Sequence, residues 1–259
     1  MSEYMLDGVD LDDVEGRWRL TGVTELPTWG APRNVNVQIP GRTGVVPLAP
    51  VSFDPFTVVL GLVVFDSGAG RVGLDANMRA LGRVLRSRGR LLTMTHNPGA
   101  GAPTRVAQVR VSGSVAPDFF PMGNAASVKA TVECPEGVWR DPANVEMDAA
   151  NLAKIDGGVM PVPDPLILVT PTKTPIKVVD VVSGASLTFT GAIQDGKTLL
   201  INPATYTATW TNNGWSGGTD VSSALSISAG GFYLTPDSAG HHSLTVSGGT
   251  AQVRARRAY

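Results

Sequence analysis

The segment from residue 35 to residue 65 constrains the fold of this chain more than any other. Residues 35–39 alternate between apolar and polar side chains, the pattern of a strand with one buried face. Pro40 and Gly41 then end the strand and turn the chain, Arg42 lies on the turn, and Gly44 closes it. After a Pro-rich bend, the apolar run 57–65 predicts another strand. Taken alone, Pro-Gly-Arg-x-Gly also suits an ordinary surface turn.

One amphipathic helix is predicted next, at about residues 74–88. Its apolar stripe is formed by residues spaced four, three and four apart: Leu74, Met78, Leu81 and Leu85. Three arginines fall on the opposite face: Arg79, Arg83 and Arg86. Asp75 is expected near the start, where a carboxylate favours the helix dipole, and Gly89 is expected to cap the end. The helix should lie on a β-structure with its arginines outward.

The rest of the chain reads as short strands separated by turns. In the first half the predicted strands are 16–26, 34–39, 57–65, 91–95, 105–113 and 125–133. In the second half they are 166–170, 176–182, 186–190, 198–201, 205–211, 224–229, 231–234, 242–247 and 251–256. Nine short strands with turns at this spacing predict a β-sandwich of about 95 residues.

The composition changes near residue 141. Residues 1–140 hold 13 of the 16 arginines, and the following stretch is rich in Pro, Gly and Asp. We therefore expect a first domain at 1–141, a linker at 142–163 and a second domain at 164–259. The predicted fold is mainly β: a β-barrel-like domain with one amphipathic helix, then a β-sandwich.

Composition and charge exclude several classes of protein. With 42% apolar and 17% charged residues, the chain can bury a core and is not disordered. Its net charge of −1 makes nucleic acid an unlikely direct partner. The acidic N-terminus lacks the basic region of a secretion signal, and an apolar run of eight residues is too short for a membrane span. The single cysteine, Cys134, is expected to be a buried structural thiol.

A search for catalytic and binding motifs predicts neither an enzyme nor a cofactor or metal site. His96 and the pair His241–His242 are expected in solvated turns, without metal-site spacing. Residues 68–73 match Gly-x-Gly-x-x-Gly by letter, but no carboxylate follows at about 20 residues, so a flexible turn is the better interpretation. Gly-x-Ser-x-Gly is absent, and paired carboxylates of a glycosidase stay open.

Three aromatic residues of the second domain are candidates for contact with a glycan or a partner. Tyr206 and Trp210 share parity in one predicted strand and so should share a face. They either stack on sugar rings or fill the sandwich core, where large aromatic side chains usually lie. Trp215 follows a turn and is the one most expected to be exposed.

The Ile-Pro-Gly-Arg-x-Gly turn of residues 39–44, followed by strand and then helix, resembles the N-terminal domain of distal tail proteins from bacteriophages with long, non-contractile tails (siphophages). The resemblance covers roughly residues 1–140. In the larger members of that family a galectin-like or carbohydrate-module-like sandwich occupies the position of the second domain here, a resemblance of architecture and placement.

The resemblance implies a virion protein made in the host cytoplasm. It implies a homohexameric ring at the distal end of the tail, a baseplate hub that joins the tail tube protein to tail-tip and adsorption proteins. DNA would be passing cargo only, and the sandwich would dock a receptor-binding protein or touch cell-surface glycans for host attachment. The alternatives are a glycan-binding sandwich outside any ring and, further off, a hydrolase.

Charge placement offers an assembly hypothesis. Residues 1–25 hold seven acids and two arginines, whereas residues 71–90 hold six arginines and one acid. These two segments are merely solvated, neutralise each other within one subunit, or meet between neighbouring subunits. Arg42, Arg79, Arg83 and Arg86 are the predicted interface residues.

Overall fold

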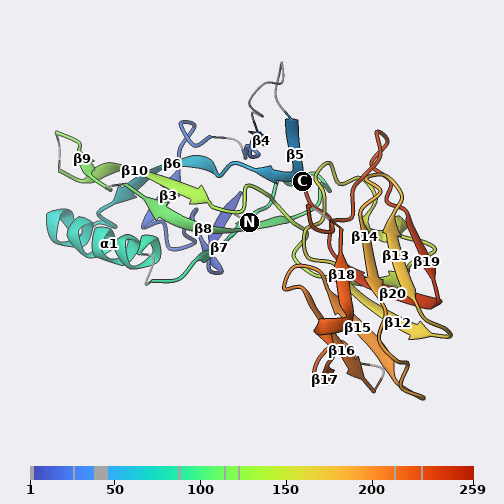
Figure 1. The fold of residues 1–259 in the computed structure, drawn as a ribbon. Helices are drawn as coiled ribbons and strands as arrows, with labels where there is room; N and C mark the ends of the chain where they lie inside the picture. Colours follow the sequence, from blue (N-terminus) through green and yellow to red (C-terminus); the bar gives the residue numbers. More distant parts are fainter. Residues whose placement is uncertain are drawn as a thin grey trace. The chain divides into compact units, whose positions relative to one another are not determined.

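The computed structural model describes residues 3–25, 27–37, 46–86, 89–113, 115–121, 123–212, 214–228 and 230–259, with the backbone alone for 32, 34–37 and 46–52. The turn that holds Arg42 lies outside the described residues. The chain is mainly β, and its contacts divide it into two compact units (Figure 1). The first comprises residues 1–33 and 53–142, and the second residues 34–52 and 143–259.

The first unit contains a curled, half-barrel sheet of eight strands. Its strands are β1 (Tyr4–Leu6), β2 (Val9–Asp10), β3 (Trp18–Leu20), β6 (Phe56–Phe65), β7 (Leu92–His96), β8 (Arg105–Ser112), β9 (Pro117–Phe119) and β10 (Ala125–Cys134). The order across the sheet is β2-β1-β7-β8-β10-β6-β3, and β9 pairs with β10. The longest pairing joins β6 to β10 antiparallel over ten residues, from Phe56 opposite Cys134 to Phe65 opposite Ala125.

Alternating side chains explain why β6 and β10 form the longest pairing of this sheet. Val58, Leu60, Leu62 and Val64 are buried, whereas Val59 and Val63 between them are more exposed; Gly61 is buried as well. Gly61 is required because the segment after β3 crosses close by, and an added Cβ would lie 2.3 Å from a Val23 methyl. The predicted strand 16–26 is therefore shorter than expected: β3 ends at Leu20, and the next residues hydrogen-bond across β6.

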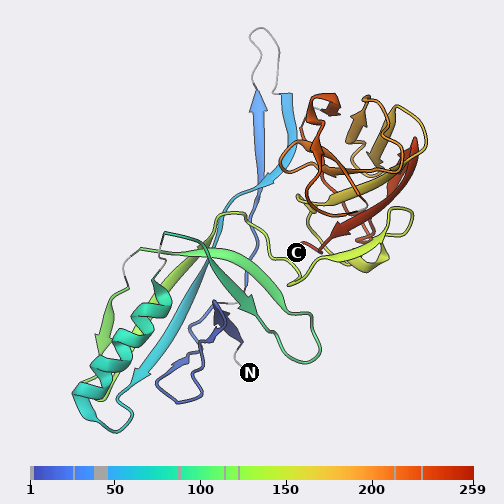
Figure 2. The same cartoon turned by 90° about the horizontal axis from the view of Figure 1, so that it is seen from below.

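Helix α1 (Gly70–Leu85) lies against β6 and β10 (Figure 2). Leu74, Leu81 and Leu85 of the predicted apolar stripe are buried, whereas Met78, its fourth member, is half-buried. Its bounds differ from the prediction of 74–88, because the turn after β6 starts the helix earlier. The Asp66 carboxylate accepts the N–H groups of Gly68 and Gly70, at 3.1 and 3.2 Å.

Two predicted roles at the helix ends are consequently wrong. Asp75 lies in the second turn, where it pairs with Arg79 instead of meeting the first free N–H groups. Gly89 comes four residues after the last helical residue, too late to be the cap. Gly73 belongs to the first turn of α1, where an added Cβ would lie 2.1 Å from the Asp66 carbonyl oxygen. These glycines thus build a tight strand-to-helix turn between antiparallel strands and α1.

Two further strands, β4 (Pro32–Val37) and β5 (Val46–Phe53), pair with each other. The Pro-rich sequence of β5 predicts only a bend, but both of its prolines lie within the strand. Each strand of a two-stranded sheet has one edge without a partner strand. A proline whose ring faces that edge removes no hydrogen bond from the sheet, so proline is tolerated there.

The second unit is built from two antiparallel sheets. The larger has the order β11-β20-β12-β15-β16-β17 and the smaller β18-β14-β13-β19. The bounds are β11 (Val145–Asp148), β12 (Leu166–Pro171), β13 (Ile176–Asp180), β14 (Ser186–Phe189), β15 (Thr198–Asn202), β16 (Thr207–Thr211), β17 (Thr219–Asp220), β18 (Leu225–Ile227), β19 (Leu244–Ser247) and β20 (Gly249–Ala255). Phe189 of β14 meets Trp210 of β16 edge to face at 5.6 Å, so the two sheets share an aromatic contact.

The segment predicted as a linker, 142–163, has structure of its own. Strand β11 pairs with β20, a 3-10 turn spans Ala153–Ile155, and Val162 bridges Leu234. Leu152, Ile155 and Val162 are buried. In the described ranges, the one α-helix has 16 residues, and no helix has the length and apolarity to cross a membrane.

Candidate assembly surface

The outer face of α1 carries the arginines that the sequence singles out. Arg79, Arg83 and Arg86 are all exposed. Arg79 pairs with Asp75 one turn away on the same helix. Arg83 and Arg86 form no ion pair with any residue that the structure describes.

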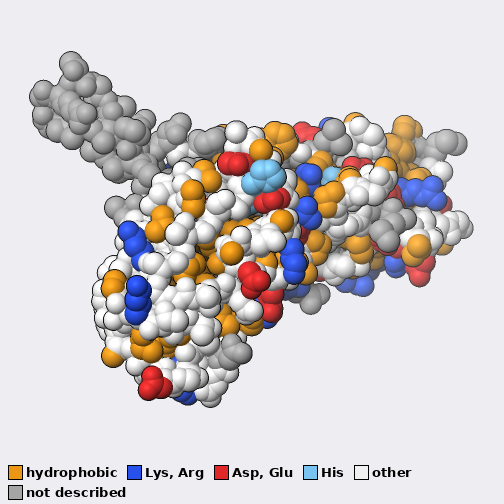
Figure 3. Space-filling model, turned by 90° about the vertical axis from the view of Figure 1, so that its right-hand side faces the viewer, with side chains coloured by type: hydrophobic (Ala, Val, Ile, Leu, Met, Phe, Trp, Pro, Cys, Tyr) orange, Lys and Arg blue, Asp and Glu red, His pale blue; other side chains and the backbone are white. Residues whose placement is uncertain are grey.

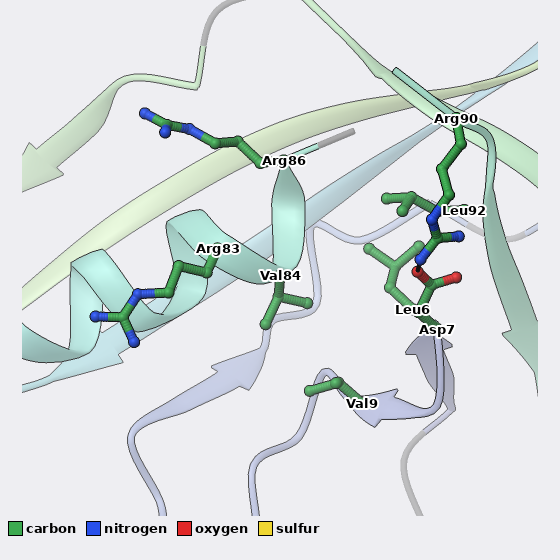
Figure 4. Close-up of a pocket in the computed structure, with 8 residues that line it drawn as sticks. All are labelled: Leu6, Asp7, Val9, Arg83, Val84, Arg86, Arg90 and Leu92. Atoms are coloured by element: carbon green, nitrogen blue, oxygen red, sulfur yellow. Dashed lines mark hydrogen bonds and ion pairs between the residues drawn. The ribbon is translucent and has the colours of Figure 1, made fainter. Parts of the chain in front are cut away.

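Arg83 and Arg86 border a hollow of about 220 Å³, here called the arginine pocket (Figure 4). It is lined by Leu6, Asp7, Val9, Arg83, Val84, Arg86, Arg90 and Leu92. In Figure 4 the Arg90 guanidinium lies against Asp7, whereas Arg83 and Arg86 extend outward from the rim. The pocket thus has an apolar wall from β1, β2 and β7 and a cationic rim from the end of α1.

Asp7 is held in place by its own backbone and by β7. It lies between β1 and β2 with φ 47°, followed by Gly8 at φ 79°, the left-handed geometry of a tight turn. Its carboxylate accepts the N–H of Thr93 at 2.8 Å and pairs with Arg90. These two interactions hold the pKa of Asp7 below its usual value, and the hydrogen bond from Thr93 has the larger effect. Asp7 and Arg90 are 83 residues apart, and their pairing is one contact of the kind expected if the acidic and arginine-rich segments neutralise each other within one subunit.

A second hollow, of about 400 Å³, lies between α1 and strands β8 and β10. Its lining is mainly apolar: Met78, Leu81, Gly82, Leu85, Arg86, Val111, Gly113, Val115 and Val128. Arg86 borders both hollows, so the last turn of α1 separates them.

The aromatic candidates of the second unit do not come together as one face. Tyr206 is 61% exposed and lies in a turn at φ 57°, before β16 begins at Thr207. Trp210 lies within β16 and is buried against Phe189. The expected shared face is therefore not formed, because the turn at 203–206 interrupts the strand alternation.

Trp215 is half-buried, contrary to the expectation that it is the exposed one. The Arg254 guanidinium lies 4.8 Å from the centre of its ring, and Arg254 is itself paired with Glu146 of β11. One face of the indole is thus covered by a cation.

Figure 3 shows basic, acidic and apolar side chains interspersed over one face of the molecule.

The histidines are placed differently from the prediction of solvated turns. His96 ends β7 and is buried beside Tyr4 and Trp139, and burial lowers its pKa. His242 is buried as well, and burial lowers its pKa too. His241 alone is exposed, and its Nδ1 lies 2.8 Å from the Asp156 carboxylate, which raises its pKa.

Cys134 is buried, as predicted, and burial raises the pKa of its thiol. Its Sγ lies 3.8 Å from the Val138 carbonyl oxygen, to which the thiol donates. Such a thiol is protonated at neutral pH and packs as a small apolar side chain.

Comparison with known proteins was made for the whole chain. Neither protein-family profiles nor curated proteins gave a match. Among solved structures, the SPP1 Dit (gp 19.1) protein, a hub of the adsorption apparatus in phages that infect Gram-positive bacteria, has a TM-score of 0.68 and 16% identity, over 99% of this chain and 98% of that chain. A chain of the phage P2 baseplate in its activated conformation has a TM-score of 0.41 and 14% identity, over 96% and 92%.

The second likeness is too distant to carry an argument. The first spans both units of the chain and nearly all of the SPP1 protein. The chain therefore has the fold of the SPP1 Dit protein, and its resemblance to distal tail proteins is confirmed at the level of the fold.

Proposed function

We propose that this chain is a structural protein of a bacteriophage tail tip, of the distal-tail type. The observation that carries the proposal is the fold shared with the SPP1 Dit hub protein over 99% of this chain. A fold alone does not determine a function. Here, however, the likeness spans both units of the chain and nearly all of the SPP1 protein.

In this proposal six copies form a ring through the first unit. One side of the ring meets the tail tube protein, the other holds tail-tip proteins, and the lumen lets DNA pass. The second unit docks a receptor-binding protein or touches surface glycans. The mechanism is geometric, so neither a cofactor nor a catalytic residue is assigned.

One observation favours the glycan-binding alternative. Tyr206 is exposed on the second unit, and an exposed tyrosine can stack on a sugar ring. For a hydrolase, the two hollows of the first unit are poor candidates, because apolar and arginine side chains dominate their linings.

Electron microscopy of the purified chain and of virion tails tests the proposal. We expect class averages of a six-membered ring, and antibody or tag labelling that places the chain at the distal end of the tail. A virion map in which the chain takes no part in a ring contradicts the proposal. A monomer that binds glycan arrays in a Tyr206-dependent manner favours the alternative.

A further inference from the structure

The first unit has a second notable feature, a hydrogen-bonded turn between β2 and β3. Its charge and its apolar tip are complementary to the arginine pocket. This acidic loop comprises residues 11–17, Leu-Asp-Asp-Val-Glu-Gly-Arg. The N–H of Asp13 donates to the Trp18 carbonyl oxygen at 3.0 Å, and the Arg17 side chain pairs with the Asp13 carboxylate at 2.8 Å. Leu11, the first residue of the loop, is fully buried. The loop is therefore presented in one conformation and loses little entropy on binding.

Val14 stands at the tip of this loop and is 93% exposed, more than any other large apolar residue that the structure describes. Its neighbours Asp13 and Glu15 already make local bonds with Arg17. An apolar side chain on a fixed, charged turn has the form of an anchor that fills a partner's pocket.

The net charges of the acidic loop and the arginine pocket are equal in size and opposite in sign. The loop has three carboxylates against one arginine, Arg17, an excess of two negative charges. The pocket has three arginines against one aspartate, Asp7, an excess of two positive charges. Each centre is apolar: Val14 on the loop, and a wall from β1, β2, β7 and α1 in the pocket. Because Val14 is exposed, the loop does not fill the pocket of its own chain.

We propose that the acidic loop of one copy docks into the arginine pocket of the next copy, with Val14 against the apolar wall and Glu15 facing Arg83 or Arg86. The inference deepens the proposed ring and rests on it. Two different patches of one chain meet in this contact, so it is heterologous and repeats head to tail until the assembly closes. Opposite charges at the rim set the orientation and speed the encounter.

Cysteine cross-linking between two kinds of copy tests the contact directly. Chains with Val14→Cys are mixed with chains carrying Arg83→Cys and oxidised mildly, while the buried Cys134 is left in place. The controls replace Val23, which is exposed beside Gly61 of β6, or Val72, which is exposed in the first turn of α1. We expect the Val14–Arg83 pair to cross-link at least tenfold more than either control pair, with the joined peptides identified by mass spectrometry.

Charge exchange supplies a second, independent measurement. Glu15→Arg and Arg83→Glu chains should each self-associate at least tenfold more weakly than the native chain. An equimolar mixture should recover association, because every contact between the two kinds of chain again places opposite charges at positions 15 and 83.

Cross-linking at the level of the controls, or a mixture as weak as its components, overturns the inference. If microscopy still shows rings, only this contact is wrong and the proposed function stands. If the cross-link forms but virion tails lack the chain, the contact stands and the proposed function fails.

Discussion

His242 illustrates how one buried side chain makes stability depend on pH. Its side chain is fully buried, and neither ring nitrogen has a hydrogen-bond partner among the described residues. Burial lowers its pKa from 6.5, although the carboxylates of Asp156, Asp180 and Asp237 oppose the shift. Below about pH 6.5 this histidine is therefore protonated in the unfolded chain but stays neutral in the folded chain. As the pH is lowered, the free energy of unfolding decreases by at most about 1.4 kcal/mol per pH unit.

We predict that His242→Asn reduces the loss of Tm between pH 7.5 and pH 5, measured by calorimetry. His96 has the same sign, so some loss remains. His241 has the opposite sign: its raised pKa contributes stability below pH 6.5 that is lost as pH rises, so His241→Asn should steepen the loss on acidification. Equal slopes for the native chain and both variants would show that neither histidine controls the response.

Gly73 and Gly82 form a matched pair on the same helix. A Cβ at Gly73 would lie 2.1 Å from the Asp66 carbonyl oxygen, whereas nothing lies within 4 Å of one at Gly82. Gly73→Ala should lower stability by about 1 to 3 kcal/mol, since backbone must move. Gly82→Ala should raise it by about 0.4 to 1 kcal/mol through helix propensity. Denaturant titration of both variants checks this, and a stabilised Gly73→Ala would contradict the close packing of the turn.

At the scale of elements, the success of sequence reasoning depends on the length and regularity of the pattern. Strand β6 and helix α1 are recognisable because each buries one face over many residues. Strands β1 and β2 are too short to give such a pattern, yet they and the turn between them supply Leu6, Val9 and Asp7 to the arginine pocket. The pairing of Asp7 with Arg90 depends on tertiary placement, which no local spacing encodes. Arg83 and Arg86, which line the pocket, could be singled out from the sequence as interface candidates because a charged helix face is periodic.

The arginine face of α1 should serve assembly and not folding. Reversing Arg79, Arg83 and Arg86 to Glu removes one exposed ion pair, which contributes about 0.3 to 0.5 kcal/mol. It also replaces the two cations at the helix C-terminus, Arg83 and Arg86, by anions, at a cost of about 0.3 to 1 kcal/mol each. The monomer should therefore stay folded by circular dichroism while the ring weakens by light scattering. Reversal of Arg79 alone is the matched control, because Arg79 does not line the arginine pocket. Unfolding of the triple variant would mean that the arginines stabilise the domain itself.

At the scale of the whole molecule, a protease should divide the chain at a short exposed segment near residue 143. The N-terminal piece then keeps residues 34–52, which by their contacts belong to the second unit. Arg140 is tied to Val106 by a two-way backbone bridge in the first unit, and β11 begins at Val145 in the second. Between these anchors, residues 142–144 are exposed and form no strand. Because β11, Ile155 and Val162 are paired or buried, the part of the predicted linker 142–163 that a protease can reach narrows to about 142–145.

A protease of low specificity at low concentration should therefore give resistant pieces that end near residue 143 and begin near residue 144, as measured by mass spectrometry. Trypsin is the matched control, because the side chain of Arg140 is buried against Glu136 and resists cleavage there. A first cut inside the sandwich, or loss of both halves together, would contradict separate folding. Separable units would suit the proposed role, since the first unit could then close a ring while the second engages whatever partner the host presents.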